Sequence, residues 1–366
     1  MSDIIRHPAP VAPGGTIGIL GGGQLGRMLA LAAARLGLKT HIYSDEQDAP
    51  AFQVTQYVTR GTYEDRVALA AFARSCNAVT FEFENVPAET LEFVGQITTA
   101  SPCTRALRTT QDRLSEKEFL TSLGLATPAF FGVSNASEAR AAYERLGGRR
   151  AILKTRRLGY DGKGQASVAS SDEASVAMDS FRGAPAILEA FVEFAFEASV
   201  IGARAADGSF AAYDPPENTH GDHILHRSIV PSRMSRVQCD EAISIAKTIS
   251  EALEFVGVFA VELFVTRDGA LLVNEIAPRV HNSGHWTIEA CAVSQFEQHI
   301  RAVAGWPLGD PARHSDAVMV NIIGNDAANW LEFAARGGAL HLYGKSNARQ
   351  GRKMGHFTTL SPLTRR

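Results

Sequence analysis

Two acidic residues, Glu262 and Glu275, lie on apolar stretches that a tight turn joins. FAVELFVT (259–266) and ALLVNEI (270–276) are rich in β-branched residues and flank an Asp-Gly dipeptide, which is typical of a two-residue hairpin turn. Closing the hairpin there places Glu262 directly across from Glu275. Facing carboxylates repel each other, and a hard cation such as Mg²⁺ relieves the repulsion by binding both. A solvated pair on an exposed sheet face is the alternative explanation.

Asn274 precedes Glu275 and offers a further oxygen ligand. Strict alternation along a strand places the two side chains on opposite faces. Participation of Asn274 in the same site therefore requires a twist or a bulge in this strand.

A lysine followed by a glycine-punctuated loop forms a second candidate site. In AILKTRRLGYDGKGQ (151–165) an apolar strand delivers Lys154, and the loop after it contains Gly159, Gly162 and Gly164. Flexible backbone beside a lysine charge suits a polyphosphate. An ordinary turn with surface cations is the alternative, but a buried, unpaired lysine is costly.

A GxGxxG motif formed by Gly21, Gly23 and Gly26 follows the apolar stretch TIGIL (16–20), and an acid, Asp45, ends the next predicted strand. Read literally, this pattern proposes a nicotinamide dinucleotide-dependent dehydrogenase. We favour a tight strand-to-helix turn whose backbone N–H groups face a phosphorylated or polar substrate.

Strands alternate with helical patterns over the first hundred residues, which indicates a parallel, doubly wound sheet. Ligands of such sheets bind beyond the carboxyl ends of the strands. Glu84 is near such an end and is a candidate substrate contact, whereas Glu82 is expected to be structural or solvated.

The composition is that of a soluble globular protein, with 366 residues, 45% hydrophobic content and a net charge of −3. This charge gives no electrostatic case for binding nucleic acid or an anionic membrane. Four scattered cysteines indicate neither a disulfide framework nor a zinc site. No apolar run approaches the ~20 residues that span a bilayer. We expect a cytoplasmic protein.

Several polar residues keep two interpretations open. Arg113 and Lys117 share a face of a helix predicted over 109–123, which by default is solvated. The histidines of HGDHILH (220–226) fall on a predicted loop and strand, so a metal triad is disfavoured. A basic turn that contains Lys345, Arg352 and Lys353 suits a substrate phosphate or a solvated tail.

Seven stretches together resemble the ATP-grasp superfamily, and most closely its N5-carboxyaminoimidazole ribonucleotide synthases, enzymes of purine biosynthesis. The stretches occur in family order and are GGGQLGRM, TFEFENVP, QDRLSEKEF, LKTRRLGYDGKGQ, VELFVT, NEIAPRVHNSGHWT and GRKMGH. The resemblance implies a mixed α/β and α+β fold of ATP-grasp architecture. Its expected parts are a disordered tail (1–13), an N-terminal Rossmann-like parallel-sheet domain (14–108), linker helices with a small lid (109–186), a larger α+β catalytic subdomain (187–300) and a C-terminal segment (301–366).

The resemblance also implies ATP-dependent carboxylation of 5-aminoimidazole ribonucleotide by bicarbonate through carboxyphosphate, with Mg²⁺ as cofactor and a homodimer as assembly. Mg²⁺ ligands would be Glu262, Asn274 and Glu275. Catalytic residues would be Tyr160, Asp161, Lys163 and Arg279. Ribonucleotide contacts would be Gln24, Leu25, Glu84, His281, Asn282, Ser283, Lys345, Arg352 and Lys353. ATP contacts would be Arg113, Lys154, Gly159, Tyr160, Asp161, Gly162, Lys163, Gly164, Gln165, Glu189, Ala190, Phe191, Val192, Glu197, His220, Asn274 and Glu275.

Lys163 departs from the family pattern, because many members carry arginine there and a bidentate grip on an oxyanion is then lost. The alternatives are another ATP-grasp ligase, such as a formate-dependent glycinamide ribonucleotide enzyme or a biotin carboxylase, the dehydrogenase, and a non-catalytic nucleotide-binding protein. The last would keep the glycine loop but lack the paired acids, and both are present here. HNSGHWT and GRKMGH favour the imidazole ribonucleotide enzyme. A dehydrogenase leaves Glu262 and Glu275 unexplained.

Overall fold

The N-terminal unit is a five-stranded parallel sheet of order β3-β2-β1-β4-β5, as predicted. The computed structural model describes residues 9–159 and 164–364. The strand order reverses between β1 and β4, and α/β sheets bind their ligands at such a switch point. The elements are β1 (Thr16–Leu20), α1 (Gln24–Arg35), β2 (Lys39–Ser44), η1 (Pro50–Val54), β3 (Tyr57–Arg60), α2 (Arg66–Arg74), β4 (Ala78–Phe81), α3 (Ala88–Gly95) and β5 (Thr99–Ala100).

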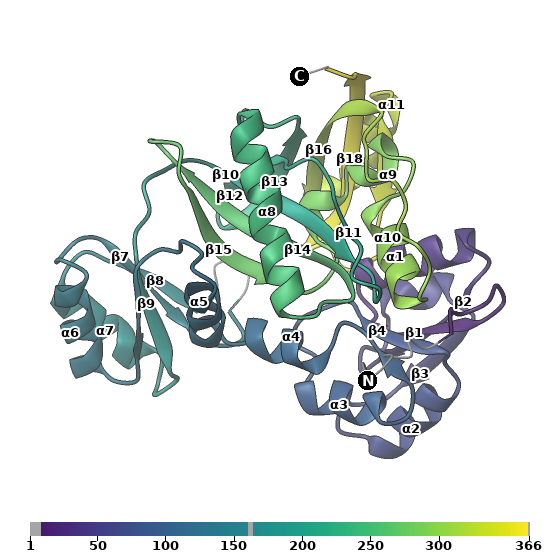
Figure 1. Ribbon diagram of the computed structural model, residues 1–366, viewed down its shortest axis with the longest axis horizontal. Helices are drawn as coiled ribbons and strands as arrows, with labels where there is room; N and C mark the ends of the chain where they lie inside the picture. Colours follow the sequence, from purple (N-terminus) through teal and green to yellow (C-terminus); the bar gives the residue numbers. More distant parts are fainter. Residues whose placement is uncertain (1–8, 160–163, 365–366) are drawn as a thin grey trace, which may run out of the picture.

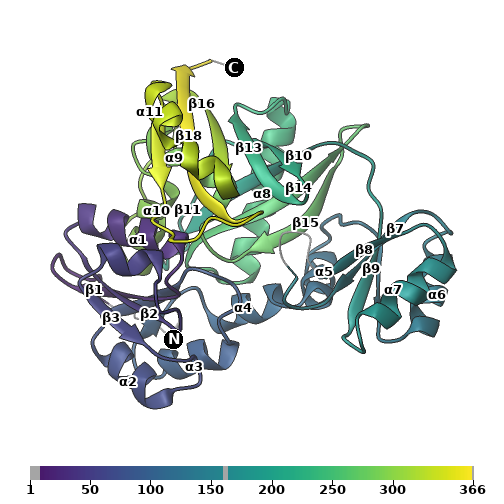
Figure 2. The ribbon, with the colours of Figure 1, turned by 180° about the vertical axis from the view of Figure 1, so that it is seen from behind.

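Two short helices, α4 (Thr104–Thr110) and α5 (Arg113–Ser122), lead out of this unit. The prediction of one helix over 109–123 was therefore wrong at its start. Asp112 separates the two, and its carboxylate caps α5 by accepting the N–H groups of Leu114 (3.0 Å) and Ser115 (3.3 Å). Figures 1 and 2 show α5 between the lid and the large sheet.

The lid is a four-stranded antiparallel sheet of order β6-β9-β7-β8 that two helices cover. It buries a hydrophobic cluster of its own. Because β9 pairs with β6 and β7, the lid extends beyond the predicted boundary at 186. Its elements are β6 (Phe130–Val133), α6 (Ala136–Arg145), β7 (Ala151–Thr155), β8 (Gln165–Val168), α7 (Ser171–Ser180) and β9 (Ala186–Ala190).

A nine-stranded sheet forms the rest of the molecule, with order β15-β14-β10-β12-β13-β16-β18-β17 and β11 beside β10. Residues 301–366 extend this sheet, since β16 pairs with β13. Its strands are β10 (Phe194–Arg204), β11 (Phe210–Ala212), β12 (Glu217–Gly221), β13 (Ile224–Val230), β14 (Gly257–Thr266), β15 (Leu271–Ala277), β16 (Ser315–Ile323), β17 (Ala339–Leu342) and β18 (Lys353–Pro362). Its helices are α8 (Arg236–Ala252), η2 (Asn282–Gly284), α9 (Thr287–Ala290), α10 (Gln295–Val303), η3 (Gly324–Asn329) and α11 (Trp330–Ala335).

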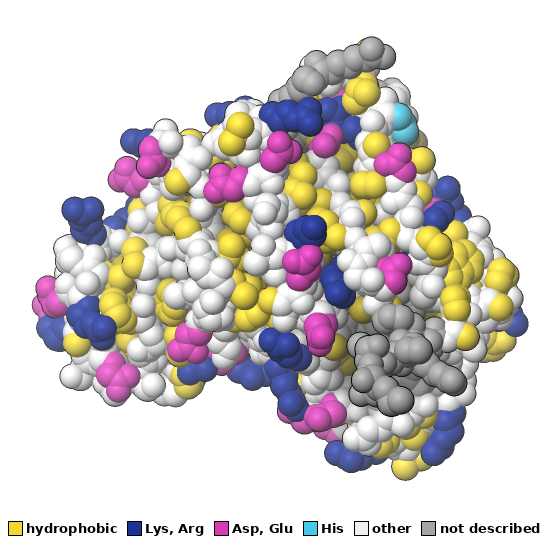
Figure 3. All heavy atoms as spheres, in the orientation of Figure 1, with side chains coloured by type: hydrophobic (Ala, Val, Ile, Leu, Met, Phe, Trp, Pro, Cys, Tyr) yellow, Lys and Arg dark blue, Asp and Glu magenta, His cyan; other side chains and the backbone are white. Residues whose placement is uncertain are grey.

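The described part of the predicted tail, residues 9–13, packs against the body of the protein, which corrects the expectation of disorder there. Val11 is buried, and its N–H donates to the carbonyl of Ala304 at 2.8 Å. The indole of Trp306 donates to the Val11 carbonyl at 2.7 Å. Among the described residues, no helix has the length and hydropathy to cross a membrane. The face in Figure 3 carries charges of both signs, interspersed.

Candidate active site

Glu262 and Glu275 face each other across β14 and β15, as predicted. The turn itself differs from the prediction, because Thr266 N–H donates to Ala270 O and the loop has three residues, ending at Gly269 with φ +90°. That turn alone would shift the pairing by one residue. A β-bulge between Glu262 and its neighbour restores it.

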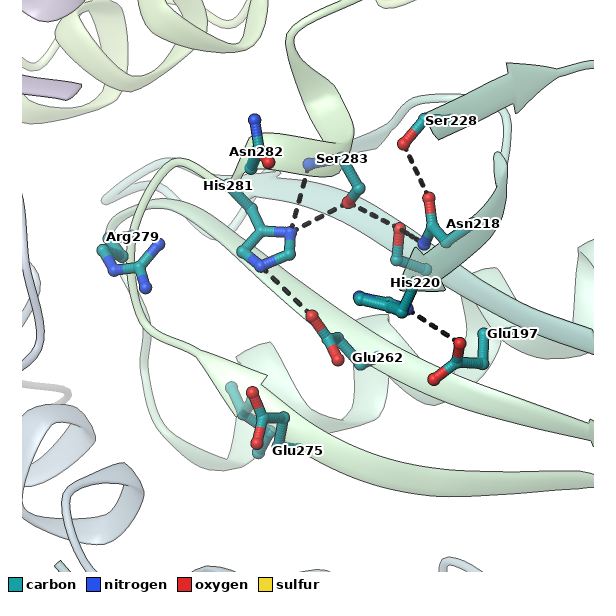
Figure 4. A network of polar contacts seen from close by, with 12 residues as sticks. Glu197, Asn218, His220, Ser228, Glu262, Glu275, Arg279, His281, Asn282 and Ser283 are labelled. Atoms are coloured by element: carbon teal, nitrogen blue, oxygen red, sulfur yellow. Dashed lines mark hydrogen bonds and ion pairs between the residues drawn. The ribbon is translucent and has the colours of Figure 1, made fainter. Parts of the chain in front are cut away.

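Asn274 is the extra residue of this bulge. Val273 and Ile276 belong to the same core cluster, so the two residues between them, Asn274 and Glu275, both lie on the opposite face. Glu262 shares that face, since its neighbours also enter the cluster. The condition set by strict alternation is thus met. Figure 4 shows Glu262 and Glu275 on adjacent strands.

A basic side chain neutralises each of these acids. The guanidinium of Arg113 donates to Glu275 at 2.9 Å and to the Gly159 carbonyl at 3.2 Å. His281 Nε2 is 3.2 Å from Glu262 Oε1. Burial would raise the pKa of Glu262, but the hydrogen bond and charge of His281 hold it at about 2.

The three oxygen-bearing side chains fit a hard divalent cation. Asn274 Oδ1 is buried and has no hydrogen-bond partner among the described residues, as expected of an oxygen that waits for a ligand. Two carboxylates and an amide oxygen on one face form a donor set that Mg²⁺ accepts. Asn274, Glu262 and Glu275 are therefore suited to hold it.

Lys154 and Lys117 converge on one carboxylate, Glu189. Lys154 Nζ is 2.6 Å from Glu189 Oε2, and Lys117 Nζ is 3.5 Å from Oε1. Lys117 is 1% exposed, so its default assignment to a solvated helix face was wrong. Burial opposes ionisation of Glu189, yet the two lysines lower its pKa to about 2.

The backbone after Glu189 continues β9, which lies between β6 and β7 in the lid sheet. The N–H groups of Ala190 and Phe191 donate to the carbonyls of Ala129 and Arg150. These two N–H groups are therefore already used, and the Glu189 side chain is paired with the two lysines. A contact of Glu189–Val192 with adenine would have to use the remaining backbone N–H and carbonyl groups of this segment. Nearby, Glu197 accepts a hydrogen bond from His220 at 2.7 Å.

The chain's own Glu82 fills the anion position of the glycine-rich turn. Its carboxylate accepts the N–H groups of Gly23 (2.8 Å) and Gly26 (3.1 Å), and a Cβ on Gly23 would lie 2.6 Å from it. Glu82 is structural, as expected. It takes the N–H groups of Gly23 and Gly26, which a dinucleotide pyrophosphate would need, and it also corrects our expectation that these groups face a phosphorylated or polar substrate. Gln24 begins α1 beside it, while the Leu25 side chain is in the core.

Glu84 and Arg279 meet at the junction of the N-terminal unit and β15, where Arg279 Nε donates to the Glu84 carboxylate. Burial would raise the pKa of Glu84, but Arg279 holds it at about 2. A pocket at this junction is also lined by Arg113 and Glu275. The structure thus joins a predicted substrate contact to Glu275, one of the predicted metal ligands.

His281, Asn282 and Ser283 were all predicted to contact substrate, but two of them are buried and engaged. Asn282 exchanges amide hydrogen bonds with Asn321. Ser283 Oγ lies 2.7 Å from Ser199 Oγ and 2.8 Å from His281 Nδ1. Figure 4 shows the polar contacts of Ser283 continuing through His281 to Glu262. Asn282 and Ser283 therefore position the loop, and His281 faces the site.

The basic turn packs against the N-terminal unit. Gln53 donates to the Gly344 carbonyl at 2.8 Å, and Lys345 donates to the Lys353 carbonyl at 2.8 Å. Burial and the charge of Arg352 lower the pKa of Lys345 to about 8. The charge of Glu82 also acts on the pKa of Lys345 and raises it slightly, because the basic turn lies near the glycine-rich turn.

Four predicted residues, Tyr160, Asp161, Gly162 and Lys163, lie outside the described residues. Gly164, just after them, has φ +71°. Gln165 hydrogen-bonds His223 at 3.1 Å. His223 lies in the turn between β12 and β13, and His226 is exposed on β13. Among the described residues, His220, His223 and His226 do not form a group of possible metal ligands.

Sequence reasoning missed several buried residues that support the site. Glu116 accepts the Ile276 N–H at 2.7 Å, and Gln295 brackets His281 by bonding both its N–H and its carbonyl. Burial, reinforced by the charge of Glu275, raises the pKa of Glu116 to about 8. Only the QDRLSEKEF motif carried a signal for Glu116. No local pattern marked Gln295.

A further group, Glu289, His341 and His356, brings three possible metal ligands together. The rings of His341 and His356 are stacked, with an interplanar angle of 7°. Their in-plane nitrogen lone pairs therefore do not converge on one ion. His341 instead hydrogen-bonds Glu289 at 2.7 Å, and Tyr343 hydrogen-bonds His356 at 2.9 Å.

Comparison with protein families agrees with this architecture. Residues 118–296 match the ATP-grasp domain, residues 15–111 the ribonucleotide synthetase preATP-grasp domain, and residues 317–365 the phosphoribosylaminoimidazole carboxylase C-terminal domain. The fold and site define an ATP-grasp ligase.

The N5-carboxyaminoimidazole ribonucleotide synthase of Brucella melitensis is 50% identical over 96% of this chain and 98% of its own, and that of Bacillus subtilis is 38% identical over 95% and 92%. An ADP complex of such a synthetase superposes with a TM-score of 0.93 at 40% identity, covering 96% of this chain and 94% of that one. This chain belongs to the N5-carboxyaminoimidazole ribonucleotide synthase family. An Aspergillus clavatus member, solved with ADP and 5-aminoimidazole ribonucleotide, has a TM-score of 0.88 at 32% identity, covering 96% and 94%.

Proposed function

We propose that this protein uses ATP and bicarbonate to carboxylate 5-aminoimidazole ribonucleotide, giving N5-carboxyaminoimidazole ribonucleotide, ADP and phosphate. The observation that carries the proposal is the shared face of Glu262, Asn274 and Glu275 beside Arg113. Together with family membership, this arrangement favours an enzyme that neutralises phosphate charge over one that transfers hydride. Glu82 supports the same choice, since it occupies the glycine-rich turn.

On the nucleotide side, the protein mainly positions and neutralises. Bicarbonate becomes a useful electrophile once its oxygen has attacked the γ-phosphorus and displaced ADP, and such transfers depend on charge neutralisation. Arg113 and Lys154 would hold the phosphates. Glu262, Asn274 and Glu275 would hold Mg²⁺, which when bound offsets charge on the phosphates.

On the ribonucleotide side, Glu84, Arg279 and His281 would surround the imidazole amine. The amine nitrogen attacks the carboxyphosphate carbon, the C–O bond to phosphate breaks, and the nitrogen loses a proton. Lys345, Arg352 and Lys353 would take the ribonucleotide phosphate, with Lys345 held in place by its bond to the Lys353 carbonyl.

The setting and assembly belong to the same proposal. Four free cysteines suit a reducing, cytoplasmic environment. A homodimer is proposed on the family resemblance, and sedimentation equilibrium at several concentrations tests it.

The deciding experiment measures phosphate release from MgATP and bicarbonate with and without 5-aminoimidazole ribonucleotide. Release that depends on the ribonucleotide supports the proposal. Release that instead requires glycinamide ribonucleotide and formate assigns a different substrate to the same class of ligase. Absence of ATP turnover with either substrate contradicts the proposed activity.

A further inference from the structure

The bulge in β15 leaves backbone groups that the sheet cannot satisfy. β15 is an edge strand, and its outer side faces α5. Lys117 Nζ donates to the carbonyls of Val273 (3.2 Å) and Asn274 (2.7 Å). The next residue back along α5, Glu116, accepts the Ile276 N–H at 2.7 Å. Two adjacent side chains therefore satisfy three backbone groups around the bulge.

Burial of both side chains makes this arrangement specific. Glu116 is 2% exposed and Lys117 is 1% exposed. Burying an ionisable group is unfavourable unless its hydrogen bonds are made, so both side chains depend on the backbone groups of β15 as partners. The helix that carries them is itself fixed, because Asp112 caps it and pairs with Arg156 at 2.7 Å.

We propose that Glu116 and Lys117 are positioning residues, which hold the bulge that places Asn274 beside Glu275 on the cleft face. This inference rests on the proposed metal-binding role of those two residues. A regular strand would restore strict alternation and turn one of the pair toward the core cluster that contains Val273. The bulge persists because its carbonyls and N–H have partners on α5.

Lys117 also connects the bulge to the lid. Its Nζ lies 3.5 Å from Glu189 Oε1, and the other oxygen of Glu189 lies 2.6 Å from Lys154 Nζ. One buried lysine therefore sets the position of the lid lysine relative to Asn274. Phosphate and metal ligands come from different sheets, and this contact aligns them.

The test compares variants that remove or keep the backbone partners. Glu116→Leu removes the acceptor and retains apolar volume, whereas Glu116→Gln keeps an acceptor oxygen. Lys117→Met removes both donated hydrogen bonds. Glu118→Ala, at an exposed position of the same helix, is the matched control. Circular dichroism establishes that each variant is folded, and the Glu116 pair decides if Lys117→Met does not fold.

The readout is Mn²⁺ binding in the presence of ADP, followed by electron paramagnetic resonance without turnover. We expect Glu116→Leu and Lys117→Met to bind Mn²⁺ at least about 10-fold more weakly than wild type, because Asn274 would no longer be held beside Glu275. A tenfold loss of affinity corresponds to about 1.4 kcal/mol of binding free energy. Glu116→Gln and Glu118→Ala should stay close to wild type.

Hydrogen exchange of the peptide that spans β15 gives a second readout without metal. Glu116→Leu should accelerate exchange there, and Glu116→Gln should restore protection. Wild-type Mn²⁺ affinity and exchange in Glu116→Leu would overturn the inference and leave the metal assignment intact. Wild-type protein that binds no Mn²⁺ with ADP would instead overturn the proposed metal role.

Discussion

Around the cleft, four carboxylates face a basic side chain from another part of the chain. Such pairing offsets the cost of burying charge, and removing one partner leaves the other uncompensated. The pairs are Glu275 with Arg113, Glu262 with His281, Glu84 with Arg279, and Glu189 with Lys154. These ion pairs therefore hold the side chains of the candidate site in fixed positions.

Glu275→Gln tests the metal assignment at the level of one atom. The amide keeps an oxygen that can accept from Arg113, so we expect thermal stability close to wild type. Loss of the negative charge should lower ATP turnover by roughly 10²–10³-fold or more, the scale of removing one transition-state-stabilising group. Phosphate release measures the effect, and Glu251→Gln on the exposed side of α8 is the control. Turnover like wild type would contradict the assignment.

Lys345 predicts a pH dependence on the ribonucleotide side. Burial lowers its pKa to about 8, so the side chain is charged below that pH and neutral above it. Attraction for a phosphate dianion should therefore weaken as pH rises through 8, and KM for the ribonucleotide should increase. Initial rates from pH 6.5 to 9.5 measure this, with Lys345→Arg as the comparison, because arginine stays charged. An identical profile in the two proteins would contradict the prediction.

At the scale of elements, α5 organises the site. It carries Arg113, Glu116 and Lys117 toward β15 and the lid within two turns. Its N-cap, Asp112, also accepts hydrogen bonds from Nε and Nη2 of Arg156, just after β7. One residue, Asp112, thus caps α5 and also anchors the base of the lid through Arg156.

Local patterns sufficed where chemistry repeats at short range. The Asp-Gly turn and apolar runs predicted the pairing of Glu262 with Glu275, and alternation correctly required a bulge if Asn274 was to join them. The turn length was wrong, and the bulge compensated for it. A three-residue turn without the bulge, or the bulge without that turn, would have broken the pairing of Glu262 with Glu275.

Long-range partners could not be predicted in this way. Lys117 looks like a solvated helix residue because its partners, Asn274 and Glu189, are distant in sequence. The same holds for Asn282, whose amide is satisfied by Asn321 on β16. Burial of a polar side chain is a property of the packed elements, and periodicity does not encode it.

Asp112 predicts how much the start of α5 contributes. Asp112→Ala removes the helix cap and the partner of Arg156, and should lower the free energy of unfolding by about 1–2 kcal/mol. Asp112→Asn keeps a capping oxygen and should recover most of the loss. Urea unfolding measures both. Equal destabilisation by the two variants would indicate that the ion pair, rather than the cap, holds the helix.

On the scale of the whole molecule, the N-terminal unit and the large sheet share one core, whereas the lid has its own. The shared cluster contains Ile17 and Leu29 from the first unit together with Val258 and Phe296 from the second. Motion of the lid therefore need not disturb the junction of those two units, where Glu84 meets Arg279.

A buried histidine on α10 links these two units through polar contacts. His299 Nδ1 accepts the Val258 N–H at 3.0 Å, so the ring proton is on Nε2, which donates to Thr80 Oγ1 at 2.7 Å. Thr80 is on β4 and Val258 is on β14. Burial lowers the pKa of His299 to about 4. A second proton on the ring would point Nδ1–H at the Val258 N–H.

This joint predicts a loss of stability in mild acid. Unfolded histidine titrates near 6.5, so between pH 6.5 and 4 the unfolded chain binds a proton that the folded chain excludes. The stability that this site contributes is intact above pH 6.5 and falls as pH decreases, by about 2 kcal/mol at pH 5.

His299→Gln should be less stable at pH 7.5 but should lose about 2 kcal/mol less than wild type between pH 7.5 and 5 in urea unfolding. His226→Gln, at an exposed position, should lose as much as wild type. His285 and His356, the other histidines that are buried in the described part of the chain, contribute equally to all three proteins, so the difference isolates His299. Equal losses in the His299 variant and wild type would show that the joint does not exclude the proton.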